Sequence, residues 1–130
     1  MIAIDTSVLI ATFTNEPDAD LYRPLLVGLP CLIGAPTVFE THLVLRGKNY
    51  PYTLEAVDIW LAEANVTVVP FDHRHMVLTR AAFDRFGKGR HPAGLNFGDC
   101  MAYAVAKAHD VPLLFKGDDF SRTDVRPTPV

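Results

Sequence analysis

The sequence has few cysteines, no long apolar run and no excess of basic residues. Cys31 and Cys100 are its only cysteines and form no CxxC motif, so we expect two buried thiols in a reducing cytoplasm rather than a disulfide. No apolar run approaches the ~20 residues of a membrane span, and the first residues lack the basic segment of a signal peptide. We therefore expect a cytoplasmic protein with no membrane segment.

The net charge of −3 gives no chain-wide attraction to nucleic acid. What the sequence does have is apolar content, since 49% of its 130 residues are hydrophobic and 21% are charged. A chain of this size buries roughly two-thirds of its extended surface, so it folds without a disulfide or structural metal. The composition predicts one compact domain over residues 1–130.

Short apolar segments alternate with helical patterns along the chain. We expect strands at residues 2–4, 31–33, 66–71 and 111–115. We expect helices at residues 8–13, 16–26, 36–45, 52–64, 72–86 and 96–109, the first capped by Thr6 or Ser7 and the second kinked or restarted at Pro24. This alternation predicts an α/β fold, a three-layer α/β/α sandwich around a mostly parallel sheet, with a glycine-rich loop at residues 87–94 and a polar tail.

Four acidic residues follow predicted strands or lie early in the next helix: Asp5, Glu40, Asp99 and Asp118. Because parallel strands place their carboxyl ends at one edge of a sheet, we expect these four side chains to converge there. Setting these acids aside leaves the rest of the chain nearly balanced in charge. The sequence therefore predicts one concentrated acidic site.

Each acid also has an ordinary structural interpretation. Glu40, placed in the first turn of its helix, can form a capping box with Thr37. Asp99 can do the same with Asn96 at the start of the next helix. Asp5 and Asp118 can be simple turn residues. The functional interpretation depends on their convergence.

Clustered carboxylates need a compensating charge or proton. Two carboxylates about 4 Å apart repel by roughly 4 kcal/mol at an effective dielectric near 20. Oxygen ligands favour Mg²⁺ or Mn²⁺, and the absence of HExxH or paired Cys/His motifs disfavours zinc. A metal held this way activates water and neutralises a phosphate in flight, which is the chemistry of phosphodiester hydrolysis.

Four segments, in order along almost the whole chain, carry a family resemblance: residues 4–8, Glu40, residues 95–100 and residues 113–120. The sequence resembles the PIN-domain ribonucleases, in particular the VapC toxins of VapBC toxin–antitoxin pairs. The resemblance implies a PIN-like fold and a Mg²⁺- or Mn²⁺-dependent endoribonuclease that cuts structured or translational RNA, plausibly tRNA. It also implies inhibition by a cognate VapB antitoxin and a homodimer.

The resemblance also assigns roles to particular residues. Asp5 and Asp99 are expected to be the principal metal ligands and Glu40 to complete the acidic cluster. Ser7 and Asn96 are expected to be polar neighbours. Asp118 is expected as the fourth catalytic acid, with the adjacent Asp119 as the alternative.

Basic residues are concentrated in residues 74–90, a segment that contains five arginines or lysines and one acidic residue. Within this segment and its loop, Lys88, Arg90 and His91 are the stronger candidates for RNA phosphate contacts, and Lys116 is a further one beside the acidic site. A solvated helix face explains the remaining arginines equally well.

Two alternative functions remain open from the residues. Asp5 after a strand can be the nucleophile of a haloacid dehalogenase-like phosphotransferase, although Ser7 stands where that motif has a second aspartate. A non-catalytic interaction module is the other alternative. If the chain is a toxin, we expect its antitoxin to place an Arg or Lys among the carboxylates.

Overall fold

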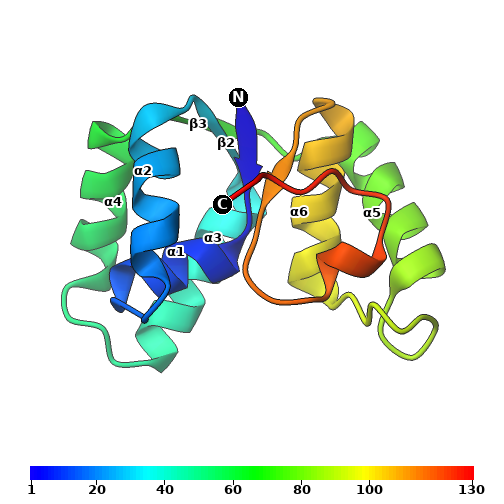
Figure 1. Cartoon of the computed structure of the whole chain (residues 1–130), viewed down its shortest axis with the longest axis horizontal. Helices are drawn as coiled ribbons and strands as arrows, with labels where there is room; N and C mark the ends of the chain where they lie inside the picture. The colour runs from blue at the N-terminus through cyan, green and yellow to red at the C-terminus, as the bar shows by residue number, and fades with distance from the viewer.

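The computed structural model describes residues 1–130 and has a parallel sheet between two layers of helices (Figure 1). The strands are β1 (Ile2–Ile4), β2 (Cys31–Gly34), β3 (Val66–Val69) and β4 (Leu113–Leu114). The helices are α1 (Thr6–Phe13), α2 (Ala19–Gly28), α3 (Ala35–Gly47), α4 (Thr53–Glu63), α5 (His73–Phe86), α6 (Phe97–Ala108) and the short 3₁₀ helix η1 (Phe120–Arg122). The predicted elements are all present, and strands 3 and 4 are shorter than expected.

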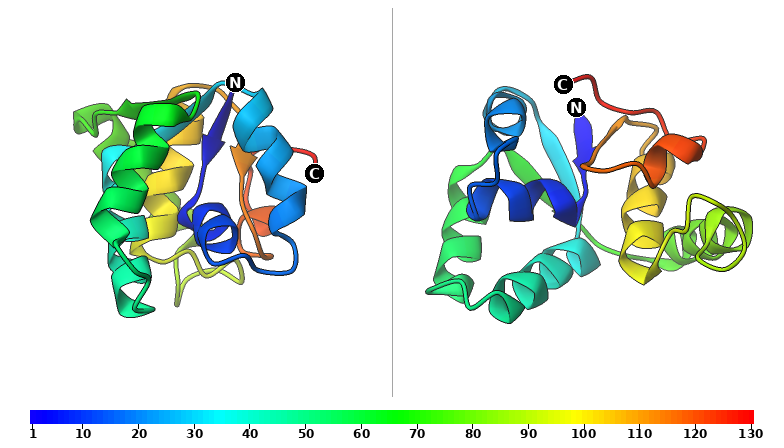
Figure 2. Two further views of the ribbon diagram at one scale, coloured as in Figure 1. Left: turned by 90° about the vertical axis from the view of Figure 1, so that its left-hand side faces the viewer. Right: turned by 60° about the horizontal axis from the view of Figure 1, so that its bottom comes forward.

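The sheet has the strand order β3-β2-β1-β4, and all three pairings are parallel. In Figure 1, α1, α2 and α4 lie on one side of the sheet and α5 and α6 on the other. The right-hand view of Figure 2 shows α3 running below α1. The predicted three-layer α/β/α sandwich is therefore confirmed.

The two sides of the sheet have separate hydrophobic cores because successive strand residues point to opposite faces. Ile2 and Ile4 of β1 pack with α1 and α2, whereas Ala3 between them packs with α5 and α6. The same alternation separates Leu113 from Leu114 in β4. Both cysteines are buried and free, as expected.

Helix α2 continues through Pro24, so the expected restart of the helix there is wrong. Proline lacks the backbone N–H that would have bonded the carbonyl of Asp20, and because Asp20 is exposed, that carbonyl is accessible to water. Tyr22 and Leu26 are buried in the adjacent core and hold the helix on both sides of the proline. None of the helices is long and apolar enough to cross a membrane.

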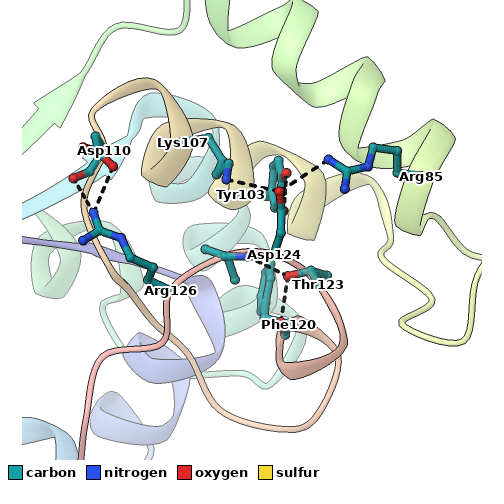
Figure 3. A network of polar contacts seen from close by, with 9 residues as sticks. Arg85, Tyr103, Lys107, Asp110, Phe120, Thr123, Asp124 and Arg126 are labelled. Atoms are coloured by element: carbon teal, nitrogen blue, oxygen red, sulfur yellow. Dashed lines mark hydrogen bonds and ion pairs between the residues drawn. The ribbon is translucent and has the colours of Figure 1, made fainter.

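The C-terminal segment is packed against the domain, although the sequence predicted only a polar tail. The backbone N–H of Leu113 donates to the Arg126 carbonyl at 2.8 Å, and that of Thr128 donates to the Leu113 carbonyl at 2.9 Å. Asp124 accepts hydrogen bonds from Tyr103, Lys107 and Arg85, which belong to α5 and α6 (Figure 3). The segment thus fastens β4 to the α5–α6 layer.

Candidate active site

Asp5 follows β1 directly and caps the N-terminus of α1, a role that the sequence had suggested for Thr6 or Ser7. Its Oδ2 accepts hydrogen bonds from the Ser7 backbone N–H at 3.0 Å and from the Ser7 hydroxyl. Its Oδ1 is buried and has no hydrogen-bond partner. One oxygen of a carboxylate that is only 4% exposed is therefore left for a ligand.

Ser7 connects Asp5 to the loop that follows β4. The Ser7 hydroxyl donates to Asp5, and its oxygen accepts the backbone N–H of Lys116 at 3.0 Å. The predicted role of Ser7 as a polar neighbour agrees with this position. Through Ser7, the Asp5 carboxylate after β1 is connected to the backbone that follows the adjacent strand β4.

Glu40 lies in the second turn of α3, because that helix begins at Ala35 with Gly34 as its cap. The expected capping box with Thr37 is therefore wrong. Instead, the hydroxyl of Thr6 donates to Glu40 Oε1, which brings the carboxylate from α3 toward the start of α1. Glu40 is thus held by a residue next to Asp5.

Gly98 provides the space for the Glu40 carboxylate at the start of α6. A Cβ atom at this position would lie 1.7 Å from Glu40 Oε2 and 2.4 Å from its Cδ. Any larger residue would displace the carboxylate. The glycine next to Asp99 therefore sets how closely α3 and α6 bring their acids together.

Asp99 forms the predicted capping box with Asn96. The Asp99 backbone N–H donates to Asn96 Oδ1 at 2.8 Å, and the Asn96 backbone N–H donates to Asp99 Oδ2 at 3.0 Å. Asp99 Oδ1 takes no part in the box. The capping and site interpretations are compatible, because each uses a different oxygen of the same carboxylate.

The carboxylates affect each other's protonation. Burial raises the pKa of Asp5 to about 6, and the charge of Glu40 adds to this rise. Burial raises the pKa of Asp99 to about 7, opposed by its bond to Asn96 and reinforced by the charges of Asp5, Asp119 and Glu40. These acids from separate elements form one electrostatic cluster.

Asp118 and Asp119 are both exposed in the turn before η1. Only the charge of Asp119 is among the causes of the raised pKa of Asp99. The backbone carbonyl of Asp118 accepts the Ser121 hydroxyl at 2.6 Å. The electrostatics therefore favour Asp119, the alternative fourth acid, over Asp118.

Asp5, Glu40 and Asp99 line an open cavity of about 330 Å³, and neither Asp118 nor Asp119 is among its lining residues. Its walls come from α1, α3, the start of α6 and the loops beside them: Asp5, Thr6, Ser7, Ile10, Glu16, Glu40, Val44, Asn96, Asp99 and Lys116. The sequence did not suggest Thr6 or Glu16. The position of Thr6 next to Asp5 could have indicated that Thr6 belongs to the site, whereas nothing in the sequence indicated this for Glu16.

Lys116 lines this cavity but is not a free cation. Its Nζ donates to Glu16 and, at 2.9 Å, to Asp18 Oδ1, and these two acids raise the pKa of the lysine. Lys88 and Arg90 lie exposed in the 87–94 loop, outside the cavity walls. The Arg90 guanidinium stands 5.4 Å from the centre of the Phe83 ring. His91 accepts the Ala93 backbone N–H through Nδ1 at 3.0 Å.

The donor set fits a hard divalent cation. Asp5, Glu40 and Asp99 offer only oxygen ligands, one of them the buried unpartnered Oδ1 of Asp5. Bound positive charge would also offset the mutual repulsion that raises the carboxyl pKa values. No three of these side chains lie at ligand distance from a common point in this structure.

Solved structures with the same fold include toxins. A toxin–antitoxin complex from Klebsiella pneumoniae matches with a TM-score of 0.76 at 16% identity, covering 100% of this chain and 98% of that one. VapC20 of Mycobacterium tuberculosis, a toxin that cleaves the sarcin-ricin loop, matches with a TM-score of 0.73 at 18% identity, covering 98% of this chain and 100% of that one. These similarities establish the fold.

Sequence relatives establish the family. The PIN domain model matches residues 2–126. A ribonuclease VapC of Mycolicibacterium smegmatis is 42% identical over 125 residues, covering 95% of this chain and 97% of the relative. Ribonuclease VapC28 of Mycobacterium tuberculosis is 41% identical over 125 residues, covering 95% and 94%. The chain therefore belongs to the PIN domain family, among the VapC ribonucleases.

Proposed function

We propose that the protein is a Mg²⁺- or Mn²⁺-dependent endoribonuclease and the toxin of a type II toxin–antitoxin pair. The observation that carries the proposal is the convergence of Asp5, Glu40 and Asp99 on one cavity, with raised pKa values at two of them. Membership of the VapC ribonucleases supports RNA as the substrate.

In this proposal Asp5, Glu40 and Asp99 hold the cation, and Asp119, whose charge acts on Asp99, is the fourth acid. A cation held by these residues would lower the pKa of a water molecule and neutralise charge on the scissile phosphate. Ser7 keeps Asp5 Oδ2 engaged so that Oδ1 faces the ligand, while Thr6 and Asn96 orient Glu40 and Asp99. Asp5 and Asp99 must lose their protons before they can bind the cation.

Contacts to RNA phosphates are proposed for Lys88 and Arg90, which are exposed on the loop that leads into Asn96 and α6. Lys116 is better placed to hold Glu16 and Asp18 than to meet a phosphate, unless substrate displaces those acids. A structured translational RNA such as tRNA is the proposed substrate class. Neither a phosphotransferase nor a non-catalytic module is favoured by the family match.

A VapB-type antitoxin is the proposed inhibitor of this site. The cavity is rich in carboxylates and its one cation, Lys116, is already paired, so an inserted Arg or Lys would find unbalanced negative charge. The match to a solved toxin–antitoxin complex is consistent with such a partner.

A homodimer is the proposed assembly. Phe39, Leu43 and Phe97 are exposed by 61%, 52% and 79%, and with Met101 they line a cavity of about 450 Å³ between α3 and α6. Exposed apolar side chains gathered around a cavity are typical of a contact surface. This surface shares Glu40 and Gly98 with the acidic site.

The proposal is tested by cleavage of a total-RNA and tRNA panel with Mg²⁺, with Mn²⁺ and with EDTA. We expect discrete metal-dependent cuts that Asp99→Asn reduces by at least about 100-fold, since it removes a charged ligand from the cluster. Asp58→Asn is the matched control, because Asp58 is an exposed aspartate on α4. Cleavage that persists in Asp99→Asn or in EDTA would contradict the proposal.

A further inference from the structure

Two histidines meet at the end of α6 remote from the acidic site. His75, in the first turn of α5, and His109, the residue that ends α6, bring their Nε2 atoms to 3.4 Å. His109 lies ten residues beyond Asp99, which is about 15 Å along a helix. The pair is therefore separate from the carboxylate cavity.

His75 is buried and contacts both Phe71 and Asp72. It is 5% exposed, its ring stacks on Phe71 at a centroid distance of 5.2 Å, and its Nδ1 lies 2.8 Å from Asp72 Oδ1. The Asp72 backbone N–H also donates a hydrogen bond to the same Nδ1, at 3.2 Å. These two contacts of Nδ1 belong to different tautomers: the shorter one, to a carboxylate, is a hydrogen bond only when Nδ1 carries the proton, and in that tautomer the buried Nε2 has a free lone pair.

His75 Nε2 contacts the Nε2 of His109, and the two rings have centroids 5.5 Å apart and planes inclined by 29°. A hydrogen bond between two nitrogens would be near 3.0 Å, and 3.4 Å is long for one. Two imidazole nitrogens that share a tetrahedral zinc, each at 2.0–2.1 Å from the metal, lie roughly 3.3–3.4 Å apart. The observed separation thus matches the bite of a metal-binding pair.

We propose that His75 and His109 bind a borderline divalent transition metal, with Zn²⁺ as the ion the geometry fits. Asp72 completes the arrangement, because a carboxylate that accepts the other ring N–H of a histidine ligand fixes its orientation and raises its basicity. No third His, Cys, Asp or Glu converges on the pair, so water fills the remaining positions on the exposed side of His109. The ion would join the start of α5 to the end of α6.

The test is calorimetric titration of Zn²⁺ into the whole protein in a large excess of Mg²⁺, in the Asp99→Asn background. Carboxylates suit Mg²⁺ whereas imidazole does not, so these conditions suppress zinc binding at the acidic site. We expect one equivalent of Zn²⁺ per chain, and a Tm about 5–10 °C higher at 100 times the Kd. Bound Cu²⁺ should show two nitrogen ligands by electron paramagnetic resonance.

The variants separate this pair from other histidines. His109→Asn should abolish the zinc equivalent and the Tm shift, and because His109 is exposed this variant should still fold. His73→Asn, at an exposed neighbouring histidine on α5, should leave both unchanged. Undiminished binding in His109→Asn, or no Zn²⁺ binding by the parent protein, would overturn the proposal and leave two imidazoles in simple contact. Neither readout depends on ribonuclease activity.

Discussion

At the scale of single residues, Gly98 controls the position of a carboxylate. We expect Gly98→Ala to reduce metal-dependent RNA cleavage by about 10- to 100-fold, because a Cβ at this position would force Glu40 away from Thr6 and Asp99. Stability should change little, since the displaced atoms are the end of a flexible side chain and alanine favours a helix. Cleavage rate and Tm are the measurements.

Gly47→Ala is the control for that substitution. Gly47 is the last residue of α3, the helix that carries Glu40, and an added Cβ there meets nothing within 4 Å. It should leave cleavage unchanged. A fully active Gly98→Ala variant would show that the Glu40 position seen in the structure is not needed for the reaction.

At the scale of the elements, the C-terminal segment is held to α5 and α6 chiefly by Asp124. The Tyr103 hydroxyl donates to Asp124 Oδ1 at 2.6 Å, and Lys107 Nζ donates to Oδ2 at 3.2 Å (Figure 3). We expect Asp124→Asn to lower the free energy of unfolding by about 1–2 kcal/mol, because a part-buried charge-assisted network loses its acceptor charge. Chemical denaturation measures this change.

The ion pair between Asp110 and Arg126 serves as the comparison. It joins the same segment to the end of α6, but both side chains are largely exposed, so Asp110→Asn should cost less than about 0.5 kcal/mol. Equal effects from the two substitutions would indicate that Asp124 gains nothing from its buried partner Tyr103.

The elements differ in how well local sequence determines them. Helices α5 and α6 were predicted nearly to the residue, because Asp72 and Asn96 are capping residues whose signal is local. The capping box expected for Glu40 was wrong, because its partner is Thr6, a hydroxyl 34 residues away. The roles of Glu16 and Lys116 depend on a contact across 100 residues, which no local pattern encodes.

The acidic edge of the sheet was predictable because parallel topology fixes where strands end, whatever the side chains do there. Asp5 therefore emerged from its position after β1. Asp99 lies in α6, which follows a loop rather than a strand, and its role as a metal ligand came from the family resemblance. The sequence could not decide between Asp118 and Asp119, since adjacent residues in a turn point in different directions. Only the effect of the Asp119 charge on the pKa of Asp99 in the folded protein distinguishes them. The packed C-terminal segment was missed for a similar reason: Phe120 and Val125 are buried singly among polar residues.

At the scale of the whole molecule, the apolar surface beside the acidic site predicts how two copies associate. Phe97 projects between two hollows, one lined by Phe39 and Leu43 and the other by Phe83 and Arg80. A ridge beside a hollow on one surface is self-complementary about a twofold axis, because the ridge of each copy can enter the hollow of the other. Such contact would cover apolar area that the single chain leaves in water.

We therefore expect Phe97→Asp to shift the protein from dimer to monomer, with Tm and far-UV circular dichroism measured alongside to show that the chain remains folded. Leu54→Asp is the control, because Leu54 is similarly exposed, at 56%, but lies on α4. Sedimentation equilibrium over a range of concentrations distinguishes the outcomes. If the unsubstituted protein is monomeric throughout, or if Leu54→Asp dissociates it equally, this surface is not the contact. Because Phe97 lies two residues from Asp99, loss of cleavage together with the dimer would indicate that association also sets the geometry of the acidic site.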